Sequence, residues 1–167
     1  SFALSQLREE ILSGLARPGT RLAEAAVGKR LGVSRVPVRE ALFTLQSEGL
    51  IEFSATGRAF VKELTTQDFE ELFTVRLTLE PAALRLAALQ LKQDSSPLTD
   101  NVAATRKAQT SREVTRLDLE FHELILEASG NARLLKLWRS LRGELELWLG
   151  GLHREHQTQT LHTLDET

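Results

Sequence analysis

Two pairs of residues in this chain combine side-chain types with a spacing that can do chemistry. Asp118 and His122 stand four residues apart, so a helix would place the carboxylate and the imidazole one turn apart on one side. Such a pair can supply two ligands to a divalent metal, although zinc sites use three or four. A salt bridge within the helix, or two solvated side chains, is the commoner role of this spacing, and both readings stay open.

Arg35 and Arg39 form the second pair and follow Ser34, a residue type that often caps the start of a helix. A recognition helix reads the major groove of DNA with residues near its N-terminus, and the arginine fork fits guanine O6 and N7. Ser34 and the first-turn amides are placed to hold a phosphate. The alternative is a solvated helix face in which the arginines pair with Glu40 or Glu48.

The elements that position these arginines are three short helices followed by a β-hairpin. The predicted helices and strands span 3–15, 23–31, 35–48, 50–53 and 59–62. The third helix presents an apolar face made of Val38, Ala41, Leu42 and Leu45. Burial of that face leaves Arg35 and Arg39 outside. Gly32 makes the turn before this helix, and Gly57 and Arg58 lie at the hairpin tip, so the order is that of a winged helix-turn-helix.

After Thr65, the spacing of the hydrophobic residues predicts helices and no strands. Helices are predicted over 66–92, 98–109, 111–128 and 132–153. The stretch from 82 to 91 is apolar nearly all round and is expected to be buried. The polar residues 154–163 are expected to form a loop between helices. The sequence therefore predicts a mainly α chain with two domains, a winged helix-turn-helix at 1–64 and an antiparallel helical bundle at 66–167.

Composition excludes several classes of protein. The 167 residues include no Cys, which excludes a disulfide scaffold and a thiol nucleophile, and 32 Leu against 3 Ile and 8 Val, which favours helices over sheet. Residues 1–65 carry 9 Lys/Arg and 7 Asp/Glu, while the residues after them carry a net negative charge. Residues 1–65 are therefore the part of the chain expected to bind a polyanion. No membrane segment is expected. The chain also lacks Met, and we expect it to be part of a longer protein.

The segment from Leu31 to Leu42, which reads Leu-Gly-Val-Ser-Arg-Val-Pro-Val-Arg-Glu-Ala-Leu, resembles the DNA-binding domain of the GntR family of bacterial transcription regulators. Further matching positions are Pro18, Gly19, Leu22, Glu24, Leu45, Glu48 to Ile51, Gly57 and Val61. Many members carry a basic or polar residue early in the second helix that reaches DNA. Here that stretch is Ala-Ala-Val-Gly at 25–28, so Lys29 or Arg30 would supply any such contact. The candidate DNA contacts are Ser34, Arg35, Val36, Arg39, Gly57 and Arg58.

The rear half is similar to the FCD effector domain of the FadR subfamily of GntR regulators. The residues that carry this resemblance are Arg76 and Glu80, Asp118, Phe121 and His122, and the run from Ala128 to Asn131. It implies a helical bundle around a ligand cavity. In many members the Asp and His of this motif bind a metal together with two later His residues, and the metal helps hold a small carboxylate. Only Asp118 and His122 match here, because His153, His156 and His162 lie in a polar segment.

The bundle is therefore expected to be incomplete at its C-terminal end, with little or no zinc or nickel held by these 167 residues alone. We also expect Arg76 and Glu80 to form a salt bridge, within the helix or between domains; the alternative is a direct effector contact from Arg76.

The function that these observations predict is a cytoplasmic bacterial regulator, a homodimeric repressor that binds an inverted repeat in double-stranded DNA and responds to a small organic acid. The alternative is a metal-dependent hydrolase-like domain, in which Asp118 and His122 hold a metal that activates water, joined to a winged helix that binds protein instead of DNA.

Overall fold

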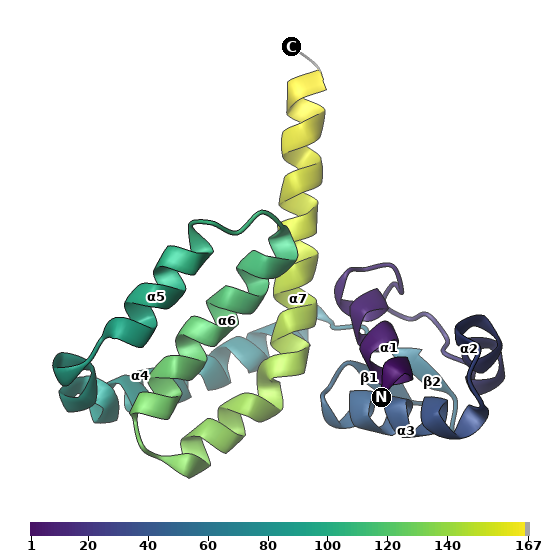
Figure 1. The fold of residues 1–167 in the computed structure, drawn as a ribbon, viewed down its shortest axis with the longest axis horizontal. Helices are drawn as coiled ribbons and strands as arrows, with labels where there is room; N and C mark the ends of the chain where they lie inside the picture. Colours follow the sequence, from purple (N-terminus) through teal and green to yellow (C-terminus); the bar gives the residue numbers. More distant parts are fainter. Residues whose placement is uncertain (166–167) are drawn as a thin grey trace. The chain divides into compact units, whose positions relative to one another are not determined.

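The computed structural model describes the backbone of residues 1–165 and the side chains of residues 1–152. The chain divides into two compact units, Ser1–Thr65 and Thr66–Thr167. Over the described residues it forms seven helices and one two-stranded sheet. Figure 1 labels these elements along the chain. The predicted fold class is confirmed: the chain is mainly α, with an N-terminal winged helix-turn-helix followed in the sequence by a helical bundle.

The first unit follows the predicted order of elements. Its elements are α1 (Phe2–Leu12), α2 (Glu24–Leu31), α3 (Arg35–Ser47), β1 (Ile51–Phe53) and β2 (Ala59–Val61). The strands pair antiparallel, with Ile51 opposite Val61 and Phe53 opposite Ala59. Helix α1 ends at Leu12 and not at residue 15, because a turn that contains Gly14, at a φ of 80°, follows it.

The core of this unit lies between α1, α3 and the hairpin. Its fully buried side chains are Leu7, Ile11, Val38, Leu42, Leu45, Leu50 and Val61. The predicted inner face of α3 is thereby confirmed, since Val38, Ala41, Leu42 and Leu45 are at most 1% exposed. Burying a side chain of this size contributes about 1.5–3 kcal/mol to folding. The orientation of α3 about its own axis is therefore strongly specified.

The turn between α2 and α3 needs two glycines for different reasons. Gly32 ends α2 in the left-handed region, at a φ of 67° and a ψ of 29°. Gly28 lies inside α2, where its carbonyl accepts bonds from the amides of Gly32 and Val33. A Cβ at residue 28 would stand 2.8 Å from the carbonyl oxygen of Val33. The glycine within this helix thus permits the close approach of the turn backbone.

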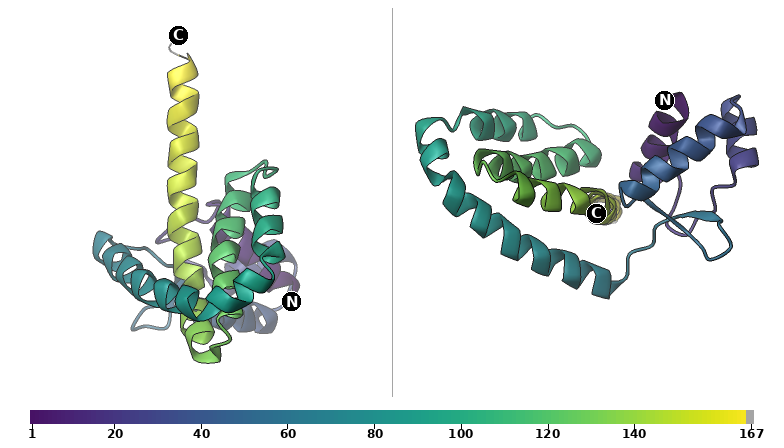
Figure 2. Two further views of the ribbon diagram at one scale, coloured as in Figure 1. Left: turned by 90° about the vertical axis from the view of Figure 1, so that its left-hand side faces the viewer. Right: turned by 90° about the horizontal axis from the view of Figure 1, so that it is seen from below.

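The second unit consists of α4 (Thr66–Gln93), α5 (Ser96–Thr105), α6 (Ser111–Ala128) and α7 (Ala132–Asp165). Helix α6 packs against each of the other three. Helix α4 curves along its length in Figure 2, and Pro81, which has no N–H to donate, lies inside it. Both α6 and α7 begin with a side-chain cap: Thr110 and Glu113 form a capping box before α6, and the Asn131 side chain accepts from two first-turn amides of α7.

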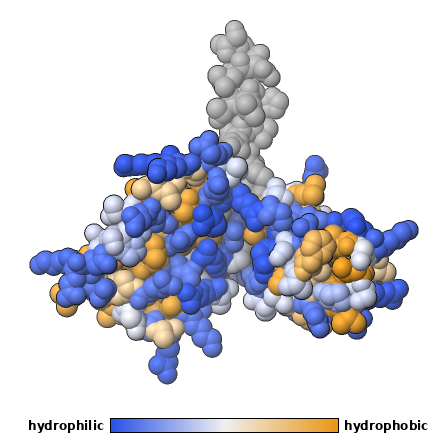
Figure 3. All heavy atoms as spheres, in the orientation of Figure 1, coloured by the Kyte–Doolittle hydropathy of each residue, from blue (hydrophilic) through white to orange (hydrophobic). Residues whose placement is uncertain are grey.

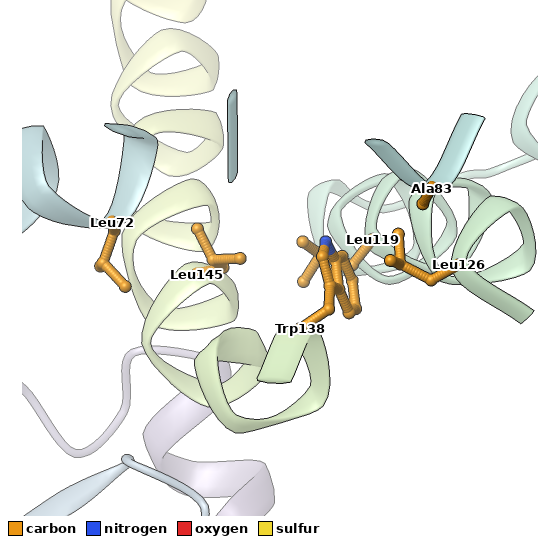
Figure 4. Packing of buried hydrophobic residues seen from close by; sticks show 6 residues of the cluster. All are labelled: Leu72, Ala83, Leu119, Leu126, Trp138 and Leu145. Atoms are coloured by element: carbon orange, nitrogen blue, oxygen red, sulfur yellow. The ribbon is translucent and has the colours of Figure 1, made fainter. Parts of the chain in front are cut away.

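Trp138 of α7 is the centre of the core of this unit. Figure 4 shows its indole beside Leu119 and Leu126 of α6, while Leu145 lies toward Leu72 of α4. All of these side chains are at most 6% exposed. The ring of Phe69 stacks on that of Trp148 with centroids 3.9 Å apart, which joins α4 to α7 at a second point. Large aromatic groups thus hold the bundle together.

Two expectations about the second unit are wrong. The apolar stretch from 82 to 91 in α4 is not buried all round, because only its small residues Ala83 and Ala87 are buried, while Leu84, Leu86 and Leu89 are 49–77% exposed. The expected loop at 154–163 is helical backbone in α7. That stretch contains neither Gly nor Pro, so nothing in it ends the helix.

The molecular surface is mostly hydrophilic on the face shown in Figure 3, with hydrophobic residues in smaller areas between. No described helix combines the length and the hydrophobicity that a bilayer-spanning segment needs.

The close approach at Gly28 generates a prediction about stability. Helix propensity alone would make Gly28→Ala stabilising by about 1 kcal/mol. We expect the opposite, a loss of about 1–3 kcal/mol in the free energy of unfolding, because the new methyl group meets a backbone oxygen that cannot rotate away. Urea unfolding followed by circular dichroism measures the change. Ala25→Gly, at an exposed position of the same helix, provides the pure propensity effect for comparison. A more stable Gly28→Ala variant would contradict the prediction.

Candidate functional site

The outer face of α3 presents a compact group of polar and apolar side chains near the N-terminus of the helix. Arg35, Val36 and Arg39 are all exposed, and Val36 is 66% exposed. The opposite face is held in the core by Val38 and Leu42. Because that core fixes the rotation of the helix, these three side chains stay directed to solvent. Among the described residues, Arg35 makes no ion pair.

The start of α3 is unusual in its capping. Ser34 takes the N-cap position with extended backbone, at a φ of −68° and a ψ of 170°, but its side chain makes no capping hydrogen bond. A capping hydroxyl accepts from the amide of the second or third helical residue, and the third residue here is Pro37, which has no amide hydrogen. The Ser34 hydroxyl and the amides of Arg35 and Val36 are consequently available to a phosphate oxygen.

Arg39 is paired, but with neither of the acidic residues considered from sequence. Its Nε donates to Glu24 Oε1 at 2.8 Å and its Nη2 donates to Glu24 Oε2 at 3.0 Å, so the contact joins α3 to the first turn of α2. These bonds hold the pKa of the Glu24 carboxyl below its usual range. Glu48 pairs instead with Arg8 of α1, at the other end of α3. The Arg39 side chain remains 62% exposed, so the pair lies on the surface.

The hairpin tip is shaped by a short turn. The Ser54 amide donates to the Arg58 carbonyl at 2.9 Å, and the Gly57 amide donates to the Ser54 carbonyl at 2.8 Å. Gly57 has a φ of 72°, which a residue with a Cβ rarely adopts. Arg58 is exposed at this tip.

On α2, Arg30 is engaged by Glu10 of α1, which leaves Lys29 as the exposed cation of that helix without an ion pair among the described residues. Lys29 and Arg30 are the two basic residues considered for a DNA contact from the second helix. Lys29 is the one that forms no salt bridge with a described carboxylate.

A different cluster lies in the helical unit around Glu80 of α4. Its Oε1 accepts from Arg76 Nε at 2.7 Å and from Trp138 Nε1 at 3.2 Å, and its Oε2 lies 3.0 Å from His122 Nδ1. The intrahelical salt bridge between Arg76 and Glu80 is thus confirmed. Burial alone would raise the pKa of the Glu80 carboxyl, but the bonds from His122, Arg76 and Trp138 outweigh burial and hold that pKa at about 2. Glu80 is therefore an anion that joins α4, α6 and α7.

This cluster changes the roles considered for His122. The carboxylate that His122 contacts is Glu80, not Asp118 one turn away on its own helix. When Nδ1 carries the proton of that contact, Nε2 is the nitrogen left to accept or to ligate. Sequence reasoning missed this partner, because Glu80 and His122 are separated by 42 positions and no local pattern relates them. The pairing of Arg76 with Glu80, by contrast, follows from their helical spacing.

The donor set of Asp118 and His122 fits part of a metal site. Both side chains are half-buried on α6, and Asp118 makes no ion pair with another described residue. No group of three His, Cys, Asp or Glu that could hold a metal occurs among the described side chains, whereas zinc needs at least three protein ligands. His153, His156 and His162 lie outside the described side chains. The described side chains thus offer two candidate ligands and do not complete a metal site.

Comparison with known proteins identifies the family. Residues 2–61 match the model of bacterial regulatory proteins of the gntR family, and residues 71–166 match the FCD domain. The chain belongs to the GntR family. Its winged helix-turn-helix is the GntR domain, and its helical unit is the FCD domain.

Curated GntR relatives are regulators of transcription. The gluconate operon transcriptional repressor of Bacillus subtilis (strain 168) is 33% identical over 148 residues, which are 86% of this chain and 60% of that protein. The Nta operon transcriptional regulator of Aminobacter aminovorans is 34% identical over 128 residues, which are 75% of this chain and 61% of that protein. The chain spans about three fifths of the length of these relatives.

A solved GntR structure has the same fold. The crystal structure of a transcriptional regulator GntR from Rhodococcus sp. RHA1 has a TM-score of 0.74 at 28% sequence identity, over 92% of this chain and 76% of that one.

The Glu80 cluster generates a second prediction. Glu80→Gln removes the charge that Arg76 and His122 face, and Arg76 is only 8% exposed, so an unpaired cation stays largely buried. We expect a loss of about 2–3 kcal/mol in the free energy of unfolding, measured by urea titration. Glu120→Gln, which breaks the exposed pair of Arg116 and Glu120, serves as the control and is expected to cost less than about 1 kcal/mol. Equal losses in the two variants would show that Glu80 is an ordinary surface partner.

Proposed function

We propose that this GntR chain is a sequence-specific repressor that acts in the bacterial cytoplasm and binds its operator as a homodimer. Its affinity for DNA changes when a small organic acid binds the FCD domain. The observation that carries the proposal is the exposed N-terminal face of α3, where Arg35, Val36 and Arg39 project from a helix whose other face is locked in the core. Recognition helices of this motif place the same region in the major groove.

The contacts proposed on DNA follow from the chemistry of each group. Arg35 and Arg39 read guanine edges through their guanidinium forks, and Val36 packs on a thymine methyl group. Ser34 and the first-turn amides beside it bind a phosphate oxygen, because the Ser34 side chain makes no capping bond that would occupy them. Gly57 and Arg58 at the hairpin tip follow the minor groove.

A two-fold dimer explains how a small module reaches useful specificity. One domain of about 60 residues covers only a few base pairs, whereas two copies on an inverted repeat double the number of base contacts. The similarity to the gluconate operon transcriptional repressor supports repression, not activation, as the proposed effect on transcription. We assign the helical unit, residues 66–167, to dimerisation and effector binding, and residues 1–64 to DNA.

The effector proposed for the FCD domain is a small carboxylate held with the help of one divalent metal, zinc or nickel. Asp118 and His122 supply two ligands, and histidines outside the described side chains supply the others. The contact between Glu80 and His122 supports this role, because a metal-binding histidine usually donates its other nitrogen to a carboxylate. The metal, when bound, anchors the effector and performs no turnover.

The DNA-binding proposal is tested on a duplex selected from a random library by the wild-type protein. We expect Arg35→Ala to bind this duplex about 1–3 kcal/mol more weakly in an anisotropy titration, because one guanine contact is lost, while the melting temperature stays nearly unchanged. Arg116→Ala, an exposed arginine of the helical unit, is the matched control. Light scattering is expected to find two protomers on each inverted repeat. Failure to enrich any sequence, or unchanged affinity in Arg35→Ala, would refute the proposal.

The metal proposal is tested by elemental analysis of protein produced from its complete gene. We expect one zinc or nickel ion per subunit in the wild type, and a parallel loss of metal and of effector response in His122→Ala. DNA binding without effector should persist, since the two units have separate cores. If His122→Ala keeps its effector response and the wild type holds no transition metal, the Asp118–His122 pair has no such role.

A further inference from the structure

The contact between Glu24 and Arg39 has a geometry that bears on how Arg39 meets a base. The carboxylate approaches the guanidinium side-on, with Nε to Oε1 at 2.8 Å and Nη2 to Oε2 at 3.0 Å. This arrangement uses the Nε hydrogen and one hydrogen of Nη2, two of the five donors that a guanidinium has. The three remaining hydrogens belong to Nη1 and to the far side of Nη2.

Those remaining donors include the pair that a guanine requires. The end-on edge of the guanidinium presents one Nη1 and one Nη2 hydrogen in parallel, and this fork matches the O6 and N7 acceptors in the major groove. Arg39 is still 62% exposed with Glu24 in place, so its free edge is open to an incoming base. One guanidinium can therefore hold Glu24 and a guanine at the same time.

Glu24 is also a fixed point from which to hold Arg39. It lies in the first turn of α2, and its side chain is 29% exposed. The backbone of α2 is anchored by buried Val27 and by the close approach of the turn at Gly28. A solvated arginine samples many rotamers, and ordering it on DNA costs conformational entropy. An arginine already oriented by a carboxylate avoids part of that cost.

The negative charge of Glu24 has a second effect on DNA binding. It lies among the cations of the α3 N-terminus, where both Arg39 and Arg35 act on it electrostatically. A carboxylate in this position reduces attraction to phosphates, which any DNA sequence offers equally. It leaves free the end-on pair of Nη1 and Nη2 hydrogens that a guanine edge requires. The charge of Glu24 thus lowers the affinity for all DNA, and the orientation of Arg39 restores affinity only at a site that carries the guanine.

We propose that Glu24 is a positioning residue that sets the sequence specificity of this protein, because it orients Arg39 toward a guanine and weakens the binding of DNA without that guanine. This inference rests on the proposed DNA-binding function. In this proposal Glu24 of α2 contributes to sequence specificity although it contacts no base.

The test compares wild type with Glu24→Gln on the selected duplex and on a scrambled duplex of equal length. We expect the ratio of the two affinities to fall about tenfold in Glu24→Gln, through weaker binding of the selected duplex and stronger binding of the scrambled one. Replacing the contacted guanine with 7-deazaguanine, which lacks the N7 acceptor, should weaken the wild type and leave Glu24→Gln nearly unaffected. In an Arg39→Ala background, Glu24→Gln should produce no further loss of discrimination.

Glu48→Gln is the matched control, because Glu48 binds Arg8 in the same side-on manner at the far end of α3, with Nε to Oε2 at 3.0 Å and Nη2 to Oε1 at 2.5 Å. It should leave the affinity ratio unchanged. An unchanged ratio in Glu24→Gln, or tighter binding of the selected duplex, would overturn the role of Glu24 while leaving the DNA-binding function intact. A wild type that does not discriminate between the duplexes would overturn both. Circular dichroism verifies that each variant is folded.

Discussion

The burial of one face of α3 against α1 is the constraint on which the candidate DNA-binding face of this chain depends. Val38, Leu42 and Leu45 leave essentially no surface to solvent, so the helix cannot rotate without exposing them. The direction of Arg35 and Arg39 is therefore a consequence of hydrophobic packing on the other side of the same helix. Strand β1 of the hairpin also contacts α3, so the same core places the hairpin beside this helix.

Ion pairs have different consequences in the two units because their surroundings differ. At the surface of the winged helix, the Glu24–Arg39 contact adds little to stability but restricts the orientation of a candidate DNA-binding side chain. In the bundle, Glu80 receives three donors from three helices in a half-buried setting, where losing the anion would leave Arg76 unpaired. Similar chemistry thus orients a side chain in one place and joins helices in the other.

Local patterns predicted most of the elements, because each signal was contained within a few residues. The capping box of Thr110 and Glu113 and the buried face of α3 are of this kind. Contacts between distant segments were not predictable in this way: Glu24 and Arg39 meet only after the α2–α3 turn forms, and Glu80 meets His122 only in the folded bundle.

The burial of α4 was overestimated because hydrophobicity alone does not tell which leucines pack against another helix. The small residues Ala83 and Ala87 are the buried ones. The loop expected at 154–163 was inferred from polarity, which does not end a helix.

Pro37 has a consequence for how freely the residue before α3 can change. In most helices the N-cap side chain is retained for folding, since replacing it by alanine destabilises the helix by about 1 kcal/mol. Here the proline fixes its own φ at a value suited to the first turn and removes one of the two amides that a cap could bind, and Ser34 makes no capping bond to the other. Folding therefore places little demand on the side chain at position 34. In the proposed DNA complex, a substitution at position 34 would therefore alter the phosphate contact without first weakening the helix.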